Sequence, residues 1–150
     1  MPHCKCKKFN THFDFQHEQR SIVVCKDKGK NRYIYENQSN DFLSKYRIDG
    51  GLITNGAKCD FLLLNCNEEQ HSYFIELKGS DIIHAIEQID RSIDILKPQL
   101  GDSKIFARIV LTRVNTPELE NHPKYLHLKK KVESLNGNLK KQTRELKEVI

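Results

Sequence analysis

The chain has no long apolar run and no hydrophobic leader. Its longest apolar stretches are only a few residues, whereas a membrane-spanning helix needs about 20, and the N-terminal MPHCKCKKF contains no signal-peptide core. Internal repeats, low-complexity tracts and linkers rich in Pro, Gly or Ser are also missing. With 37% hydrophobic and 30% charged residues, we expect a single soluble, cytoplasmic domain that spans all 150 residues and does not engage a membrane.

Cysteines are few and odd in number. The five positions are Cys4, Cys6, Cys25, Cys59 and Cys66. Without a secretion signal, such a set favours reduced thiols over a disulfide framework. The N-terminus also concentrates possible zinc ligands, which leaves a zinc site open as an alternative to an ordinary frayed terminus: His3, Cys4, Cys6, His12 and His17.

The net charge of +5 is carried by the C-terminal segment. Residues 121–150 contain eight Lys or Arg and three Glu, a net of +5, so the first 120 residues are neutral with 17 basic and 17 acidic side chains. A basic segment on a neutral body is expected of a surface that binds a polyanion, and a solvated helix face is the alternative. The candidate phosphate contacts are Lys129, Lys130, Lys131, Lys140 and Lys141.

Short β-branched and aromatic runs predict strands near the N-terminus. Residues 21–26 (SIVVCK) and 32–36 (RYIYE) flank KDKGKN, a turn rich in Lys, Gly and Asn. This pattern predicts a hairpin within an N-terminal extension over residues 1–36. A brief helix over residues 40–46 and a short strand over residues 52–54 are expected to follow.

Two apolar runs of strand length come next. Residues 57–64 and 72–77 are joined by a polar loop and are expected to pair as antiparallel neighbours. Ser80 can cap the following helix. Isoleucines at three- and four-residue steps predict an amphipathic helix packed on a sheet, until Pro98 and Gly101 stop it.

The remaining third continues the alternation. Residues 104–114 predict a strand, and Pro123 could occupy the first position of a helix that ends near Gly137. Residues 139–150 are ambiguous between strand and helix. The order β-β-(α)-β-β-β-α-β-α-(β) predicts an α/β fold in the broad sense, that is, a mixed α+β fold. It has a central mixed sheet flanked by helices.

Three charged residues stand out in the paired apolar runs. Asp60 lies in KCDFLLL, and Glu76 and Lys78 lie sixteen and eighteen residues later in FIELKG. Because side chains alternate faces along a strand, Glu76 and Lys78 project from the same side, roughly 7 Å apart, with Leu77 on the other side. A hairpin can bring Asp60 to the same edge of the sheet.

This trio suits phosphodiester cleavage. Two carboxylates, with a backbone carbonyl and waters, are ligands for Mg²⁺ or Mn²⁺ rather than for zinc. The metal lowers the pKa of a bound water, and a nearby lysine can orient that water or stabilise charge on the phosphoryl oxygens.

The two segments KCDFLLL and FIELKG resemble the motif of the PD-(D/E)XK nuclease superfamily, the restriction-endonuclease-like fold. The resemblance implies that Asp60 and Glu76 are metal ligands, that the Leu77 carbonyl is a third, and that Lys78 acts on the attacking water. It also implies an αβββαβ core, similar to the pattern of residues 40–114.

The chain departs from the family motif at two positions. Cys59 stands where the motif has its proline. A subset of the family adds a glutamine on the following helix, a place similar to that of Gln88, but the usual tyrosine four residues later is Ser92 here. His84 and Gln88 lie one helical turn apart; they are either aimed at the site or ordinary residues of a polar helix face. Some members recruit a further acidic residue, for which the candidates are Glu36 and Asp49.

The leading hypothesis is therefore a small Mg²⁺- or Mn²⁺-dependent endonuclease, with DNA favoured over RNA as substrate. Its small size favours a homodimer or a partner protein. One alternative is a non-catalytic module that keeps the fold and binds nucleic acid. Another is a purely structural domain, in which Glu76 and Lys78 form an ordinary surface ion pair.

Overall fold

A computed structural model of the chain describes residues 6–78, 81–112 and 117–150, apart from the side chains of Lys78, Pro117 and Glu118. These residues form nine strands, two α-helices and one short 3-10 helix. In chain order the elements are β1 (Phe13–Glu18), β2 (Ile22–Lys26), β3 (Arg32–Glu36), β4 (Phe42–Arg47), β5 (Phe61–Cys66), β6 (Gln70–Lys78), α1 (Ile82–Leu100), β7 (Lys104–Leu111), η1 (Pro117–Asn121), α2 (Pro123–Ser134), β8 (Leu139–Thr143) and β9 (Glu145–Val149).

The larger of the two sheets contains six strands in the order β1-β4-β5-β6-β7-β8. Neighbouring strands from β1 to β6 are antiparallel, whereas β6, β7 and β8 run parallel. The direction changes because α1 carries the chain back across the sheet before β7, as a parallel connection requires. The predicted antiparallel pairing of the two apolar runs is confirmed, and so is the mixed central sheet with helices against it.

The smaller sheet joins the two ends of the chain. β2 and β3 form the hairpin predicted over residues 21–36. β9 adds to β3 in parallel, so the C-terminal strand completes a sheet that the N-terminal hairpin begins. The ambiguous residues 139–150 thus form two strands, β8 in the large sheet and β9 in the small one, with Arg144 between them.

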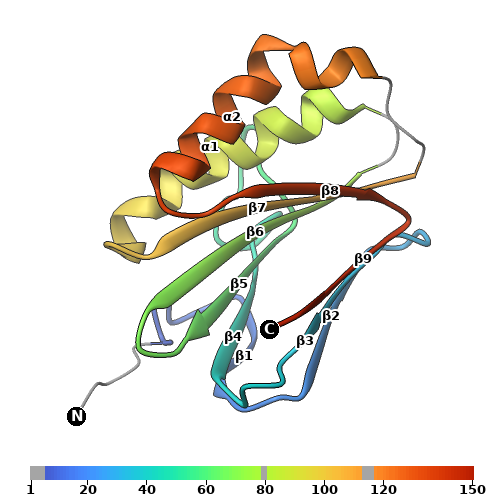
Figure 1. The fold of residues 1–150 in the computed structure, drawn as a ribbon. Coiled ribbons are helices and arrows are strands. Elements are labelled where there is room, and N and C mark those ends of the chain that lie inside the picture. The colour runs from blue at the N-terminus through green and yellow to red at the C-terminus, as the bar shows by residue number, and fades with distance from the viewer. Residues whose placement is uncertain (1–5, 79–80, 113–116) are drawn as a thin grey trace.

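The helices and the small sheet lie on opposite faces of the large sheet (Figure 1). Leu62 and Phe74 pack with the isoleucines of α1 in one buried cluster. The next residues along each strand, Leu63 and Ile75, belong to a second cluster with Tyr33 and other residues of the small sheet. Because both faces of β5 and β6 are covered, consecutive residues such as Leu62, Leu63 and Leu64 of β5 and Tyr73, Phe74 and Ile75 of β6 are all buried, without alternation between apolar and polar residues.

Helix α1 begins one residue later than a cap at Ser80 would place it. The Asp81 carboxylate accepts a hydrogen bond from the His84 N–H (3.0 Å) and caps the helix, while Ser80 lies outside the described residues. The helix passes Pro98 and ends at Gly101; a proline in the last turn removes a single backbone hydrogen bond and does not stop the helix. No helix among the described residues is long and apolar enough to cross a membrane.

The expectations for the segment before β5 are wrong. Residues 40–46 were expected to be helical, but β4 occupies most of them, and residues 6–78 contain no helix at all. Leu43 and Tyr46 are three residues apart, as on a helix face, yet they belong to the two opposite clusters of the core. A strand covered on both faces therefore imitates helical spacing. Residues 52–54 contribute only an isolated β-bridge.

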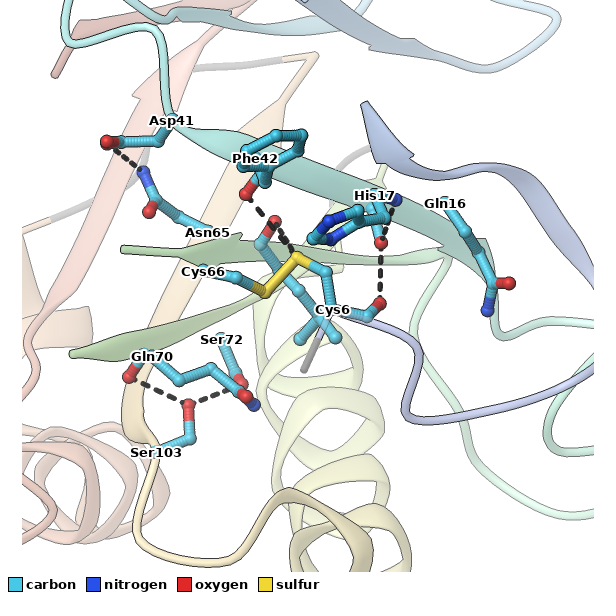
Figure 2. The surroundings of a disulfide bond; sticks show 12 residues. Cys6, Gln16, His17, Asp41, Phe42, Asn65, Cys66, Gln70, Ser72 and Ser103 are labelled. Carbon is cyan, nitrogen blue, oxygen red and sulfur yellow. Dashed lines mark hydrogen bonds between the residues drawn. A yellow bond between two sulfur atoms is a disulfide. The ribbon is translucent and has the colours of Figure 1, made fainter. Parts of the chain in front are cut away.

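The expectation of reduced thiols is wrong for two cysteines. Cys6 and Cys66 form a disulfide that closes 60 residues of sequence and ties the N-terminal segment to the end of β5 (Figure 2). The Cys6 carbonyl also accepts hydrogen bonds from the Ser44 hydroxyl (2.6 Å) and the Tyr46 hydroxyl (3.1 Å). As a disulfide sulfur, Cys6 is not a thiolate ligand for zinc. His12 and His17 join no group of three possible metal ligands among the described residues, and His3 and Cys4 lie outside those residues.

A buried ion pair connects the two sheets. Arg108 of β7 and Glu148 of β9 are 2% and 7% exposed. The Arg108 Nε and Nη2 atoms donate to the two carboxylate oxygens of Glu148 at 2.6 and 3.2 Å. The Tyr33 hydroxyl and the Lys140 ammonium donate to the same carboxylate at 2.7 and 3.0 Å. Burial raises the pKa of Glu148, but the hydrogen bonds and charge of Arg108, with the bonds from Tyr33 and Lys140, hold it below its usual value.

Replacing Glu148 with glutamine should lower the free energy of unfolding by about 3–5 kcal/mol, because Arg108 would be left buried without its anionic partner. A carboxyl with a lowered folded-state pKa stabilises the fold above its unfolded pKa near 4.5 and loses that contribution as the pH falls through the lower folded value. Urea unfolding at a series of pH values should therefore show a loss of stability below pH 4.5 that is smaller in Glu148→Gln than in the wild type.

Glu145→Gln is the matched control, because Glu145 lies on the same strand and its pair with Arg32 is 42% and 52% exposed at the two side chains. This change should cost less than about 1 kcal/mol. Equal losses in the two variants would contradict a central role for the buried pair.

Candidate functional site

Asp60 lies where the antiparallel pairing of β5 and β6 ends. The last paired residues are Phe61 and Ile75; Asp60 precedes the first and Glu76 follows the second. The Asp60 N–H donates to the Ile75 carbonyl (3.1 Å), and the Asp60 carboxylate accepts from the Leu77 N–H (2.9 Å). Asp60 is therefore bonded to the residues on both sides of Glu76, and the fold brings the two predicted ligands together.

The backbone of Leu77, the third predicted ligand, faces Asp60. Its N–H donates to the Asp60 side chain in place of a backbone carbonyl of β5. In an extended strand the N–H and C=O of one residue point to the same side. The Leu77 carbonyl is therefore directed toward the side on which β5 has ended and Asp60 begins.

Glu76 is a buried carboxylate on the helix side of the sheet. Its side chain is 2% exposed. Phe74, two residues earlier, packs under the helices, and Ile75 and Leu77 pack against the small sheet, so the alternation of side chains directs Glu76 toward α1.

Cys59 lies beside both carboxylates. Burial raises the pKa of its thiol well above the usual value, and the charges of Glu76 and then Asp60 raise it further, while a hydrogen bond with Ser92 acts in the opposite direction. Cys59 is a free, fully buried thiol. A raised pKa keeps it protonated at neutral pH, so we assign it no nucleophilic role.

Helix α1 holds the loop that leads into Asp60. Gln88 Nε2 donates to the Lys58 carbonyl (3.0 Å), and the Ser92 hydroxyl accepts from the Cys59 N–H (2.9 Å). One turn away, Arg91 Nη1 donates to the carbonyls of Asn55 (2.9 Å) and Ala57 (2.7 Å). Four hydrogen bonds between the backbone of residues 55–59 and three side chains of one helix fix the approach of the chain to the site.

The two departures from the nuclease motif contact each other. The Cys59 N–H donates to Ser92, whose hydroxyl donates in turn to the Gln88 carbonyl (2.7 Å). Proline has no N–H and could not make this bond. A cysteine in place of the motif's proline and a serine in place of the usual tyrosine therefore fit together as one arrangement.

Gln88 and His84, one turn apart, have different surroundings. Since the Lys58 carbonyl can only accept, the amide nitrogen of Gln88 faces it. The amide oxygen, Oε1, is then buried and has no hydrogen-bond partner among the described residues. His84 is exposed. The structure thus places Gln88, and not His84, against the loop of the candidate site.

The other expected site residues lie at different distances from the carboxylates. The backbone of Lys78 ends β6 beside Leu111 of β7, and its side chain lies outside the described residues. Asp49 follows Ile48, whose N–H donates to the Asp60 carbonyl (2.9 Å), so Asp49 lies near the site. Glu36 lies in the small sheet and pairs with Lys147 at 2.8 Å.

Three of the five lysines expected to bind phosphate form ion pairs with described residues. Lys131 pairs with Asp90 and Asp94 of α1, both at 2.5 Å. Lys140 pairs with the buried Glu148, and Lys141 pairs with Glu120 on η1, each at 3.0 Å. The remaining two, Lys129 and Lys130, are exposed and form no ion pair with a described residue.

No group of three or more His, Cys, Asp or Glu side chains gathers to hold a metal in the part of the chain that the structure describes. The two carboxylates at positions 60 and 76 fall one short of such a group. A metal ion here would take its remaining ligands from the Leu77 carbonyl and from water, as Mg²⁺ commonly does.

Comparisons of the chain with protein-family models, with curated proteins and with solved structures find no match. The resemblance to the nuclease superfamily rests on the motif residues Asp60, Glu76 and Lys78.

Sequence reasoning gave no role to the residues that position the site. Ser92 was noted only as a departure from the motif, and Arg91 was not singled out. Both are polar residues on a helix whose neighbours Ile89 and Ile93 are fully buried, and that is the signal that could have identified them. Their partners are backbone atoms of residues 55–59, which sequence patterns do not reveal.

Replacing Ser92 with alanine should lower the free energy of unfolding by about 1–3 kcal/mol, because the Cys59 N–H would remain buried without its acceptor. Amide hydrogen exchange at Cys59 should accelerate in the same variant. The control is Ser134→Ala, which removes an exposed hydroxyl bonded to the Lys131 carbonyl (2.6 Å) and should change stability by less than about 0.5 kcal/mol. Unchanged exchange at Cys59 in Ser92→Ala would contradict the positioning role.

Proposed function

We propose that this protein is a metal-dependent nuclease that hydrolyses phosphodiester bonds of nucleic acid, with DNA favoured over RNA, through a site of the PD-(D/E)XK type. The observation that carries the proposal is the bonding of Asp60 to both neighbours of Glu76 at the end of the β5–β6 pair. It supports the pairing of two carboxylates that the motif predicts.

The donor set fits a hard divalent cation. Asp60 and Glu76 directly follow the last residue pair of two neighbouring strands, so their negative charges repel each other. The burial of Glu76 strengthens that repulsion. Asp60, Glu76 and the Leu77 carbonyl would hold the ion, and all three offer oxygen atoms, which Mg²⁺ and Mn²⁺ prefer. When bound, such an ion supplies a coordinated water of lowered pKa and screens the charge of the phosphate.

Other residues of the chain would act on the water and the phosphate. Lys78 follows Glu76 by two positions on the same strand, and its ammonium would orient the attacking water or stabilise charge on the phosphoryl oxygens. The buried Oε1 atom of Gln88 would accept a hydrogen bond from that water or from the ammonium. Ser92 and Arg91 would act indirectly, because they hold the loop before Asp60.

Asp60→Ala and Glu76→Ala should each reduce cleavage of plasmid DNA in Mg²⁺ by about 100-fold or more, because each change removes a ligand from a site with only two carboxylates. The assay compares supercoiled, linear, branched and single-stranded DNA and a matched RNA, in Mg²⁺ and in Mn²⁺. Both variants should keep the circular dichroism spectrum of the wild type.

Glu68→Ala is the control variant, because Glu68 is an exposed carboxylate in the turn at the other end of β5 and β6. It should cleave as the wild type does, and the loss of cleavage in equally purified site variants then excludes a contaminating nuclease. Full activity in either site variant would refute the assignment. Wild-type protein that binds DNA but cleaves no substrate would favour the non-catalytic module.

A further inference from the structure

Most of the positive charge in residues 121–150 is neutralised within the fold. Five of its eight basic side chains form ion pairs with acidic residues outside or inside the segment. The partners include Glu87 and Asp90 of α1 and Glu36 of β3. A lysine that already has a carboxylate at 2.5–3.0 Å has less to gain from a phosphate, so the anion-binding surface has to be sought elsewhere.

The turn of the β2–β3 hairpin carries a denser charge. Residues 26–32 (KDKGKNR) hold four basic side chains and one acidic one, a net of +3 (4 − 1) over seven residues. The one acid, Asp27, is used locally, since its carboxylate accepts from the Gly29 N–H (2.7 Å) and shapes the turn. Lys26, Lys28 and Lys30 are exposed and pair with no acidic side chain in the described residues.

Two of these basic residues are placed against each other. Lys26 and Arg32 are directly opposite across the hairpin, and like charges in that position destabilise a strand pair. Arg32 is partly compensated by Glu145 at 2.6 Å, in a pair that is about half exposed at both side chains. Binding of an external anion at this exposed turn would offset the repulsion between Lys26 and Arg32, and so would explain why both are basic.

Arg144 adds a fifth basic residue at the same place. It forms the one-residue turn between β8 and β9 with φ of +69°, a backbone conformation that favours glycine or asparagine. The Arg32 N–H donates to the Arg144 carbonyl (2.9 Å). An exposed arginine in a strained turn beside the hairpin again indicates a role for its charge.

The hairpin turn lies at the edge of the sheet that carries the candidate site. Lys78, at the end of β6, pairs with Leu111 of β7, and the Leu111 carbonyl accepts from the Arg144 N–H (2.7 Å). Because neighbouring strands are about 4.8 Å apart, Arg144 lies roughly 10 Å from the backbone of Lys78. Figure 1 shows the β2–β3 turn beside the β8–β9 turn, on the side of the molecule where β6 and β7 end.

Lys129 and Lys130 lie toward the opposite edge. They lie in the second half of α2, and the helix is followed by Leu135, whose carbonyl accepts from the Ile105 N–H (3.3 Å) at the start of β7. The end of α2 is thus fixed to the edge where the parallel strands begin, whereas the candidate site lies where they end.

We propose that the β2–β3 turn, with Lys26, Lys28 and Lys30, and the adjacent Arg144 bind the phosphates of duplex DNA beside the Asp60–Glu76 site. This inference rests on the proposed function. A separation of roughly 10 Å is close to the width of the major groove, about 12 Å. A duplex with one phosphate at the carboxylates would therefore bring other phosphates to the turn.

The test is a salt titration of binding to a 20-base-pair DNA duplex, in Ca²⁺ to suppress cleavage. Each phosphate contact contributes a slope of about −0.9 to the dependence of log K on log salt. Lys28→Gln/Lys30→Gln should flatten the slope by about 1.8, and Arg144→Asn, which keeps a residue suited to positive φ, by about 0.9. The matched control, Lys129→Gln/Lys130→Gln, removes the same charge from exposed positions and should leave the slope unchanged.

Four outcomes would overturn the inference. A salt slope that is unchanged in Lys28→Gln/Lys30→Gln, or that is flattened equally in the control variant, would overturn the inference. The proposed function would still hold in that case if the wild type cleaved DNA in Mg²⁺. Wild-type protein that neither binds nor cleaves any of the DNA or RNA substrates would overturn both. The variants could also lose the same number of phosphate contacts with single-stranded DNA of the same length, at a slope near −0.7 per contact. The partner would then be a single strand and not a duplex, which would overturn the proposal as stated.

Discussion

The site and the sheet depend on one constraint, the antiparallel pairing of β5 and β6 and the way it ends. Both strands are buried on both faces, so their register is fixed by packing against the helices on one side and the small sheet on the other. At the last pair the Asp60 side chain replaces a backbone acceptor for Leu77. The hydrogen bond that terminates the pairing is therefore the same bond that fixes Asp60 beside Glu76.

The elements predicted from strong periodicity are present in the structure. The two apolar runs and the N-terminal hairpin were predicted from strand length and flanking turn residues, and α1 was predicted from isoleucines at three- and four-residue steps. The helix predicted over residues 40–46 depended on a possible N-cap at its start, and the segment forms β4 instead, with Leu43 and Tyr46 buried on opposite faces of a covered sheet. The pairing of β9 with β3 and the disulfide of Cys6 with Cys66 were not foreseen, since both join segments distant in sequence.

The two carboxylates at positions 60 and 76 were predictable as neighbours, since a motif on two adjacent strands needs only local pairing to assemble. The supporting residues were not. Ser92 and Arg91 act on backbone groups, and the neutralisation of Lys131 by Asp90 and Asp94 depends on how α2 packs on α1. Charge counted along the sequence predicted a phosphate-binding surface in residues 121–150. The ion pairs of those lysines are the reason that we propose the β2–β3 turn instead.

The central claim is that Asp60 and Glu76 hold one divalent cation. Calorimetric titration of the wild-type protein with Mn²⁺, without nucleic acid, tests it most directly. The claim predicts one bound ion per chain, no measurable binding to Asp60→Asn or Glu76→Gln, and retained binding to Lys78→Met, because the lysine is assigned to the water and the phosphate. Absence of binding in the wild type, or equal binding in all four proteins, would contradict it.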